Sequence, residues 1–345
     1  MNTVSKRPFV NPRARHDFRL RSCSIVASGS CLPERVVATA ELGRKLGKDS
    51  DWILTRTGIR ERRIAAKSEL TSDLAAQAAQ RALHHANLSA ADVDLVIVAT
   101  NTPDMLFPAT ACLVQSKIGA RRCAAFDLKA AGAGFLYALE IGQQFVATRC
   151  CETVLVIGAE KLSSVVDPQN CDTSILFGDG AGAVLLQHRN GSAGLLTSCL
   201  GSDGDKASLL SMPAGGSRLP ASRDSVAGGL HFLQMNGPEM FKQAVQAMHR
   251  AAQEALHQSG LTVSQINCII PHQSNQRITD AFADKLGAAS EQVFSNIEKR
   301  GNTSAASIPI ALDEAVQAGR IARDDLVLLV GFGGGLTWGA TVLEW

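Results

Sequence analysis

Two short polar loops carry the side chains that are best suited to catalysis. His272 lies in the loop 271–275, which directly follows a predicted strand over Ile266–Ile270. Asn302 lies in the loop 301–309, which is rich in small polar residues. Both side chains can donate a hydrogen bond to an oxygen that gains negative charge, and ligand sites in α/β folds gather at strand ends. The loops therefore predict one shared pocket, with two alternatives left open: a structural role for His272, and a helix cap by Asn302.

The stretch Ala125–Phe135 reads as an apolar strand, a turn of small residues and the start of a helix. A helix N-terminus favours negative charge, whether on a thiolate or on an oxyanion. A nucleophile is the residue expected at the centre of such a turn, and Gly132 stands there. Because glycine offers only its backbone, this position decides how the site is interpreted.

Two glycine-rich loops could suggest a nucleotide site. The loops Gly178–Gly182 and Gly331–Gly335 each run into an apparent strand and not into a helix. A dinucleotide fingerprint needs a helix whose N-terminus meets the pyrophosphate, so we predict no Rossmann site. The second loop is either a tight turn or a backbone that approaches a substrate and donates an N–H group.

Basic residues gather in two places. Around Trp52 the arginines either form a solvated face or bind a phosphate-bearing ligand, with the indole as a surface on which a base can stack; they are Arg44, Arg56, Arg60, Arg62 and Arg63. Farther along the chain, a basic docking surface could be formed by Lys242, Arg250 and Arg277.

Apolar strands alternate with helices in two series along the chain. The first series begins near Asp94, Ala125 and Thr153, and the second near Ile266, Val293 and Leu326. Each gap is close to the ~30 residues of a strand–helix–strand unit. Continuous apolar strands imply sheets that are covered on both faces. We therefore predict an internal duplication of two α/β halves, with a single long doubly wound sheet as the alternative.

The other elements and the boundaries follow from the same pattern. Further strands are predicted over Ser24–Gly29, Gly182–Gln187, Val293–Ile297 and Thr337–Glu344, and helices over Thr39–Leu46, Thr71–Ala86, Ala109–Ile118, Ala133–Thr148 and Pro238–Gln258. A glycine- and serine-rich region, 191–229, interrupts the pattern. We predict a flexible extension over 1–19, an N-terminal half over 20–190 and a C-terminal half over 191–345.

The composition excludes several classes of protein. A formal net charge of +2 gives no general preference for nucleic acid. No apolar run approaches the ~20 residues needed to cross a bilayer, and the basic N-terminus lacks the apolar core of a signal peptide. The nine cysteines include no CxxC pair. We therefore expect free thiols in a reducing cytoplasm, no metal site, and no membrane or nucleic-acid partner.

Together these motifs resemble the β-ketoacyl-acyl carrier protein synthase III family of the thiolase superfamily. The matching stretches run in the family's order between about Ser24 and Trp345; they are Asp51–Arg62, Ala125–Asp127, Phe177–Gly182, Pro271–Gln273, Gly301–Ser307 and Gly333–Gly339. The resemblance implies an α/β, thiolase-like fold with a duplicated αβαβα architecture in five layers. It also implies a homodimeric acyltransferase of fatty acid or secondary metabolism.

The resemblance implies a reaction as well. In this family a cysteine takes an acyl group from acyl-coenzyme A, which is a substrate and not a cofactor. Malonyl-acyl carrier protein then loses carbon dioxide, and its carbanion attacks the thioester. His272 and Asn302 match the residues that hold the malonyl thioester and stabilise its enolate. The backbone N–H groups of Gly132 and Gly334 match the oxyanion hole.

Other positions match the family's binding residues. The substrate-binding positions are Trp52, Arg56, Phe241, Phe332, Asn275 and Phe107. Of these, Trp52 and Arg56 match the clamp on the adenine end of coenzyme A, and Phe107 matches a residue that reaches across the dimer to limit acyl length. Lys242 and Arg277 match the basic surface that meets the acidic carrier protein.

The departures from the family pattern are as informative as the matches. The family's cysteine falls on Gly132, and neither Ala131 nor Ala133 has a functional group to replace it. Many relatives carry an arginine toward coenzyme A within the stretch that here reads Gln-Asn-Cys-Asp, 169–172, and Pro238 replaces a polar residue of the pantetheine tunnel. These changes count against acetyl-coenzyme A as an ordinary donor.

Three accounts of Gly132 remain open. The chain is an engineered variant of an active condensing enzyme, altered so that it has lost its nucleophile and cannot form the acyl-enzyme. Alternatively, it is a natural acyltransferase or malonyl decarboxylase that needs no covalent intermediate. The third account is a non-catalytic partner subunit of a related condensing enzyme.

Overall fold

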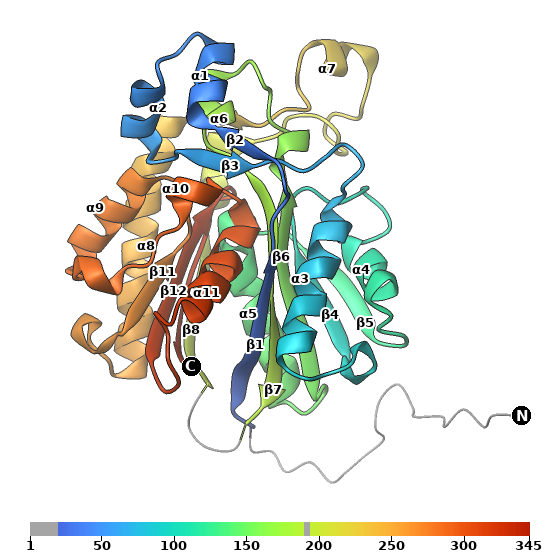
Figure 1. Cartoon of the computed structure of the whole chain (residues 1–345), viewed down its shortest axis with the longest axis vertical. Helices are drawn as coiled ribbons and strands as arrows, with labels where there is room; N and C mark the ends of the chain where they lie inside the picture. The colour runs from blue at the N-terminus through green and yellow to red at the C-terminus, as the bar shows by residue number, and fades with distance from the viewer. Residues whose placement is uncertain (1–19, 190–193) are drawn as a thin grey trace, which may run out of the picture.

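The computed structural model describes residues 20–189 and 194–345 (Figure 1). Its first sheet has the strand order β1-β7-β6-β4-β5. The strands are β1 (Cys23–Cys31), β4 (Leu95–Ala99), β5 (Ala124–Leu128), β6 (Thr153–Lys161) and β7 (Asp179–His188). β4 runs parallel to β5 and β6, whereas β7 is antiparallel to β6 and β1.

The second sheet repeats this arrangement with the order β8-β13-β12-β11. Its strands are β8 (Gly194–Ser202), β11 (Cys268–Pro271), β12 (Leu326–Gly333) and β13 (Thr337–Glu344). β11 is parallel to β12, and β13 is antiparallel to β12 and β8. A single parallel bridge between Ile269 and Val293 stands where β5 stands in the first sheet. The matching order and directions confirm the predicted duplication.

Helices fill three layers around the two sheets, as Figure 1 shows. α3 (Thr71–His85) and α4 (Thr110–Ile118) cover the outer face of the first sheet, and α8 (Gly237–Ser259) and α9 (Gln276–Leu286) cover that of the second. α5 (Gly134–Ala147) and α11 (Ser307–Gln317) lie between the sheets, and their apolar side chains share one core with both. The five-layer αβαβα fold is therefore confirmed.

Local sequence explains where the long helices begin and end. In α8 the Asn236 side chain accepts a hydrogen bond from the Glu239 N–H, and Pro238 occupies the first turn, where its missing N–H costs nothing. The helix ends at Gly260, which takes a left-handed φ of 69°. In α3 the Asp73 carboxylate accepts the Leu70 N–H at 2.9 Å. The buried face of this helix is mostly alanine, which allows close packing on the sheet.

The remaining helices and strands are shorter and connect the elements of the five layers. They are β2 (Val36–Ala38), α1 (Thr39–Leu46), α2 (Ser50–Thr57), β3 (Glu61–Arg63), α6 (Cys171–Ser174), β9 (Leu210–Ser211), α7 (Arg223–Ala227), β10 (Gln234–Met235) and α10 (Ile297–Arg300). Within the described residues, no helix has the length and apolar character of a membrane span.

The structure corrects two sequence predictions. The strand predicted over Val293–Ile297 is wrong: only Val293 pairs with a neighbour, and the chain turns into α10 at Ile297. The region 191–229 contains the nine-residue strand β8, which is hard to recognise because it is a partly exposed edge strand with small residues. The predicted extension 1–19 and the predicted boundary at 190/191 lie outside the described residues.

Candidate active site

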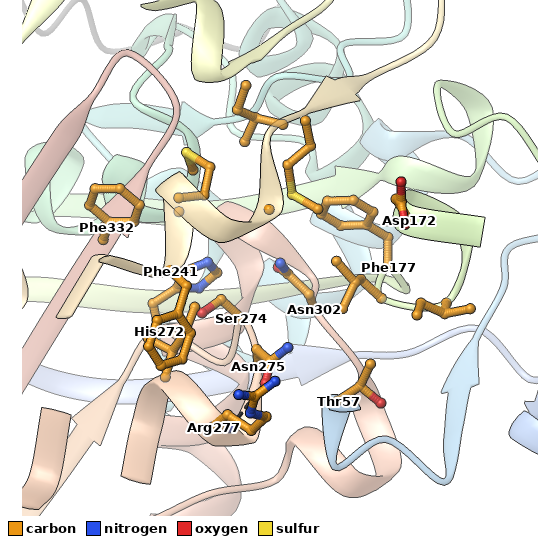
Figure 2. A pocket seen from close by; sticks show the side chains of 18 of the residues that line it. Thr57, Asp172, Phe177, Phe241, His272, Ser274, Asn275, Arg277, Asn302 and Phe332 are labelled. Atoms are coloured by element: carbon orange, nitrogen blue, oxygen red, sulfur yellow. Dashed lines mark hydrogen bonds between the residues drawn. The ribbon is translucent and has the colours of Figure 1, made fainter. Parts of the chain in front are cut away.

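A cavity of about 1020 Å³ opens between the two halves and brings most of the predicted site residues together. Residues of the cavity wall that the sequence predicted are Trp52, Arg56, Gly132, Phe241, His272, Asn275, Arg277, Asn302 and Phe332. Figure 2 shows that His272 and Asn302 both project into it. The wall also includes Asp172, Met235, Pro238, Met240 and Ser304.

His272 follows β11 directly and is fixed at both its backbone and its ring. Its N–H donates to the Val330 carbonyl at 2.7 Å, and its Nδ1 lies 2.5 Å from the Ser307 hydroxyl. Burial lowers the pKa of His272 to about 4, so the imidazole is neutral near pH 7. The Ser307 oxygen also accepts the Gln273 N–H at 3.3 Å. When the Ser307 hydroxyl donates to Nδ1, Nε2 carries the ring proton and can donate into the cavity.

Asn302 is held by the segment 176–178 and by its own loop. Its N–H donates to the Leu176 carbonyl at 2.9 Å, and its carbonyl accepts the Gly178 N–H at 2.9 Å. The side-chain Oδ1 accepts the Ser304 N–H at 2.9 Å. Because Oδ1 is engaged in this way, the amide nitrogen is the end of the side chain left to donate into the cavity.

Gly132 lies in a 3-10 turn, Ala131–Ala133, immediately before α5, and Ala131 has a left-handed φ of 46°. A β-carbon placed on Gly132 would lie 2.4 Å from His272 Nε2 and 2.4 Å from the Phe332 carbonyl oxygen. The space that a cysteine side chain would need is thus taken by the imidazole and by the backbone of β12. None of the residues that line the cavity in the described chain is a cysteine.

The glycine loop after β12 packs closely against this turn. A β-carbon on Gly333 would lie 2.4 Å from the Gly132 nitrogen, so only glycine permits this approach. Gly333 lines the cavity, whereas Gly334 does not belong to its wall. The predicted oxyanion hole of Gly132 and Gly334 therefore stays a prediction.

The mouth of the cavity combines an aromatic ring with charges of both signs. The Arg56 guanidinium lies 4.1 Å from the centre of the Trp52 ring, and Lys48 lies 5.5 Å from it. The Asn275 amide donates to the Arg56 carbonyl at 3.1 Å, which ties α2 to α9. Asp172 adds a carboxylate to the same wall. The sequence marked the stretch around Asp172 as unusual but did not place its side chain in the site.

One predicted binding residue, Phe107, and one predicted docking residue, Lys242, lie away from the cavity wall, whereas the other docking residue, Arg277, lies on it. Phe107 is 88% exposed, and Lys242 does not belong to the wall. Arg277 lines the cavity and lies 5.6 Å from the Phe241 ring. A guanidinium beside an aromatic ring suits a ligand that carries a phosphate on an otherwise apolar chain.

The arginine cluster near Trp52 is divided between several roles. Arg62 is 1% exposed and donates to the Ile175 carbonyl at 2.7 Å, so a solvated face is the wrong reading for this residue. Burial lowers the pKa of Arg62 to about 10. Arg60 pairs with Glu298. Of the five arginines, Arg56 is the one that reaches the cavity wall.

Comparisons with known proteins agree with this architecture. Residues 126–204 match the family model for 3-oxoacyl-[acyl-carrier-protein] synthase III, and residues 256–345 match the model for its C-terminal part. A β-ketoacyl-[acyl-carrier-protein] synthase III from Caldanaerobacter subterraneus is 48% identical over 94% of this chain and 98% of its own. One from Symbiobacterium thermophilum is 49% identical over 95% and 99%.

The chain belongs to the β-ketoacyl-acyl carrier protein synthase III family.

Solved structures of this family share its fold. The synthase III of Aquifex aeolicus is 44% identical and superposes with a TM-score of 0.87 over 94% of this chain and all of its own. A priming β-ketosynthase of a polyketide biosynthetic pathway is 35% identical, with a TM-score of 0.88 over 94% of this chain and 97% of its own. Synthase III enzymes are condensing acyltransferases that use acyl-coenzyme A as a substrate and need no cofactor. Across residues 20–189 and 194–345, no three His, Cys, Asp or Glu side chains gather in a way that could hold a metal ion.

Proposed function

We propose that this chain is a synthase III-type enzyme in which Gly132 replaces the nucleophilic cysteine, so that it forms no acyl-enzyme. Its remaining chemistry is the decarboxylation of a malonyl thioester, with His272 and Asn302 as the catalytic donors. The observation that carries this proposal is the 2.4 Å separation between His272 Nε2 and a β-carbon on Gly132. The imidazole stands where the thiol side chain would begin.

The geometry of the two donors suits decarboxylation. Loss of carbon dioxide breaks the bond between the carboxylate and Cα and leaves an enolate, whose negative oxygen needs donors that are already in place. A proton from water then converts the enolate into the acetyl thioester that is released. His272 offers Nε2–H from a neutral, buried ring, and Asn302 offers its amide from a side chain fixed through Oδ1. A neutral donor is sufficient here, since the reaction neither consumes nor supplies a proton before the enolate forms.

An altered condensing enzyme is the second candidate, and the same turn distinguishes the two. A site that had merely lost its thiol would still have room for the side chain. Here both a ring and a backbone carbonyl occupy that room, and the Phe332 carbonyl belongs to a buried strand that resists displacement. We therefore favour the enzyme without a covalent intermediate.

The remaining parts of the proposal concern partners and boundaries. A homodimer is supported by the loop that carries Met105, Leu106 and Phe107, which are 47%, 80% and 88% exposed, because an apolar loop of this kind is normally covered by a partner.

The proposed docking residues for acyl carrier protein are Lys242 and Arg277. The proposed contacts to the pantetheine-linked substrate are Trp52, Arg56, Phe241, Phe332 and Asn275. The two halves are proposed to meet near residue 190, and the chain to act in the cytoplasm.

Intact-protein mass spectrometry tests the missing acyl-enzyme. We expect no mass increase when the wild-type chain is incubated with acyl-coenzyme A, and little acylation of Gly132→Cys, because the new β-carbon meets Phe332. Stoichiometric acylation of Gly132→Cys at unchanged stability would favour the altered condensing enzyme.

Size-exclusion chromatography tests the account of a non-catalytic partner subunit. A stable homodimer that shows no preference for mixed dimers with a homologue would exclude that account.

A further inference from the structure

A buried guanidinium lies directly behind the cavity wall without belonging to it. Arg62 on β3 is 1% exposed and is the largest of the fully buried side chains. Within residues 20–189 and 194–345 it has no ion-pair partner, and its hydrogen bonds go to uncharged oxygens. Because an unpaired charge in the interior costs several kcal/mol, the bonds that offset this cost indicate what the residue does.

The guanidinium holds the wall segment that follows α6. Its Nη2 atom donates to the Ile175 carbonyl at 2.7 Å, and its Nη1 atom donates to the Thr39 hydroxyl oxygen at 3.0 Å. Ile175 is the C-cap of α6 and lines the cavity, as do Leu176 and Phe177 (Figure 2). Since the donors of a guanidinium lie in one plane at fixed angles, these two bonds fix where the Ile175 carbonyl lies.

The same wall segment holds the backbone of Asn302. The N–H and the carbonyl of Asn302 both bond to the segment 176–178, with which it forms a parallel bridge. The Arg62 side chain packs behind both partners of this bridge. A β-carbon on Gly178 or on Gly301 would lie 3.2 Å from Arg62 Cβ. The arginine therefore contacts the wall segment and the residue before Asn302 at the same time.

We propose that Arg62 is a positioning residue that holds the wall segment 175–178 and thereby sets where Asn302 donates into the cavity. If the bond to the Ile175 carbonyl is lost, the segment can shift, and the Asn302 backbone shifts with it because the two are paired. A displacement of about 1 Å in an active site is enough to lower a rate substantially. This inference rests on the proposed role of Asn302 as a donor.

The next residue on β3 offers a matched control. Arg63 makes the same kind of bond, from its guanidinium to backbone carbonyls, but its acceptors are Pro33 at 3.2 Å and Glu34 at 3.3 Å. Successive residues of a strand point to opposite faces, and neither Arg63 nor its acceptors belong to the cavity wall. Equal substitutions of Arg62 and Arg63 thus remove similar bonds on opposite sides of one strand.

The first experiment measures steady-state carbon dioxide release from malonyl-acyl carrier protein by the full chain. We expect Arg62→Gln to lower kcat about tenfold with little change in KM, because Asn302 acts on the charge that develops in the transition state. Arg62→Lys keeps a cationic donor and should lower kcat about threefold. Arg63→Gln and Arg63→Lys should each stay within about twofold of the wild-type value.

Two kinetic results would overturn the proposal. One is an unchanged kcat in Arg62→Gln, and the other is an equal fall in kcat for Arg62→Gln and Arg63→Gln. If Arg62→Gln does not fold, the same comparison is made between Arg62→Lys and Arg63→Lys, where an equal kcat would overturn the proposal.

A crystal structure of Arg62→Gln separates this inference from the proposed function. We expect the segment 175–178 and the Asn302 backbone to be displaced together relative to the wild-type chain. An Asn302 in its wild-type position would overturn the positioning role even if the wild-type enzyme decarboxylates. Conversely, a displaced Asn302 together with a wild-type chain that releases no carbon dioxide would support the positioning role and remove the proposed function.

Discussion

Each half of the molecule contributes one turn to the cavity. The two turns have similar backbone conformations but different polar groups. In the N-terminal half, β5 leads through the 3-10 turn Ala131–Ala133 into α5. In the C-terminal half, the segment after Val293 leads through the 3-10 turn Ser304–Ala306 into α11. The first residue of each turn is left-handed, with φ 46° at Ala131 and 48° at Ser304. The turns pack against each other where the halves meet.

The two turns differ at their first residue and just beyond their end. Ala131, Gly132 and Ala133 have no polar side chain, whereas the Ser304 N–H donates to Asn302 Oδ1, and Ser307, directly after the second turn, lies within hydrogen-bond distance of His272 Nδ1. The comparison teaches that the fold itself maintains the strained turn, since the turn persists without a nucleophile. The positions of the two donors, His272 and Asn302, depend instead on particular hydrogen bonds from the C-terminal half. We therefore expect substitutions in the C-terminal turn to change chemistry and those in the N-terminal turn to change packing.

Removal of a cavity donor should have the largest effect. We expect His272→Ala and Asn302→Ala each to lower kcat for carbon dioxide release by ~10²–10³-fold, as the loss of one oxyanion donor does elsewhere. Steady-state release from malonyl-acyl carrier protein measures this. A comparable loss in Gly134→Ala, which adds a methyl group at the first residue of α5 directly after the other turn, would show that the loss of activity is not specific to the donors and would contradict the comparison.

Stability should depend on pH through His272. The pKa of this residue is lowered by burial from 6.5 to about 4. Between these values the unfolded chain binds more protons than the folded one, so stability rises with pH through this window and is complete above 6.5. As pH falls from 6.5 to 4 we expect the loss of on the order of 3 kcal/mol.

Urea unfolding at several pH values checks this dependence against His272→Gln. The variant should lack the part of the slope that belongs to the histidine. An identical slope in the wild-type chain and in His272→Gln would assign the dependence to other groups.

A methyl group on Gly132 should disturb packing. Its β-carbon would lie 2.4 Å from the Phe332 carbonyl oxygen, so we expect Gly132→Ala to lower the free energy of unfolding by ~1–3 kcal/mol. Gly134→Ala is the control, because its β-carbon would lie 3.3 Å from the nearest atom, the Ala99 side chain. Equal urea midpoints for these two variants would mean that His272 and Phe332 yield easily, and that the site keeps room for a nucleophile.

The smallest effect should come from Ser307. Its hydroxyl supports His272 Nδ1, and one such hydrogen bond contributes ~0.5–1.5 kcal/mol net. We therefore expect Ser307→Ala to lower kcat by up to about tenfold with KM unchanged. A value of kcat equal to that of the wild-type chain would show that the ring keeps its tautomer without the serine.

Much of the fold could be predicted from the sequence because its signals are local. Helix α1 and strand β13 lie at their predicted positions, since Gly47 ends the helix and a mostly apolar run forms the strand. Strand β8 was missed because half-exposed edge strands lack a continuous apolar run. The prediction of a strand at Val293 failed for the opposite reason: an apolar residue there pairs through a single bridge, and no sheet neighbour supports a longer strand.

The candidate site was predictable in its parts but not in its contacts. His272 stands at a predicted strand end, whereas Asn302 follows α10 where a strand was predicted, and both reach one cavity. That the His272 ring fills the space beside Gly132 depends on residues 140 positions apart, and no local pattern encodes it.

The most direct test of the account is the rate of carbon dioxide release from malonyl-acyl carrier protein in the absence of any acyl donor. The wild-type chain should release carbon dioxide through His272 and Asn302 although Gly132 has no thiol, and His272→Ala should lose this activity. A wild-type rate no higher than that of His272→Ala would contradict the central claim.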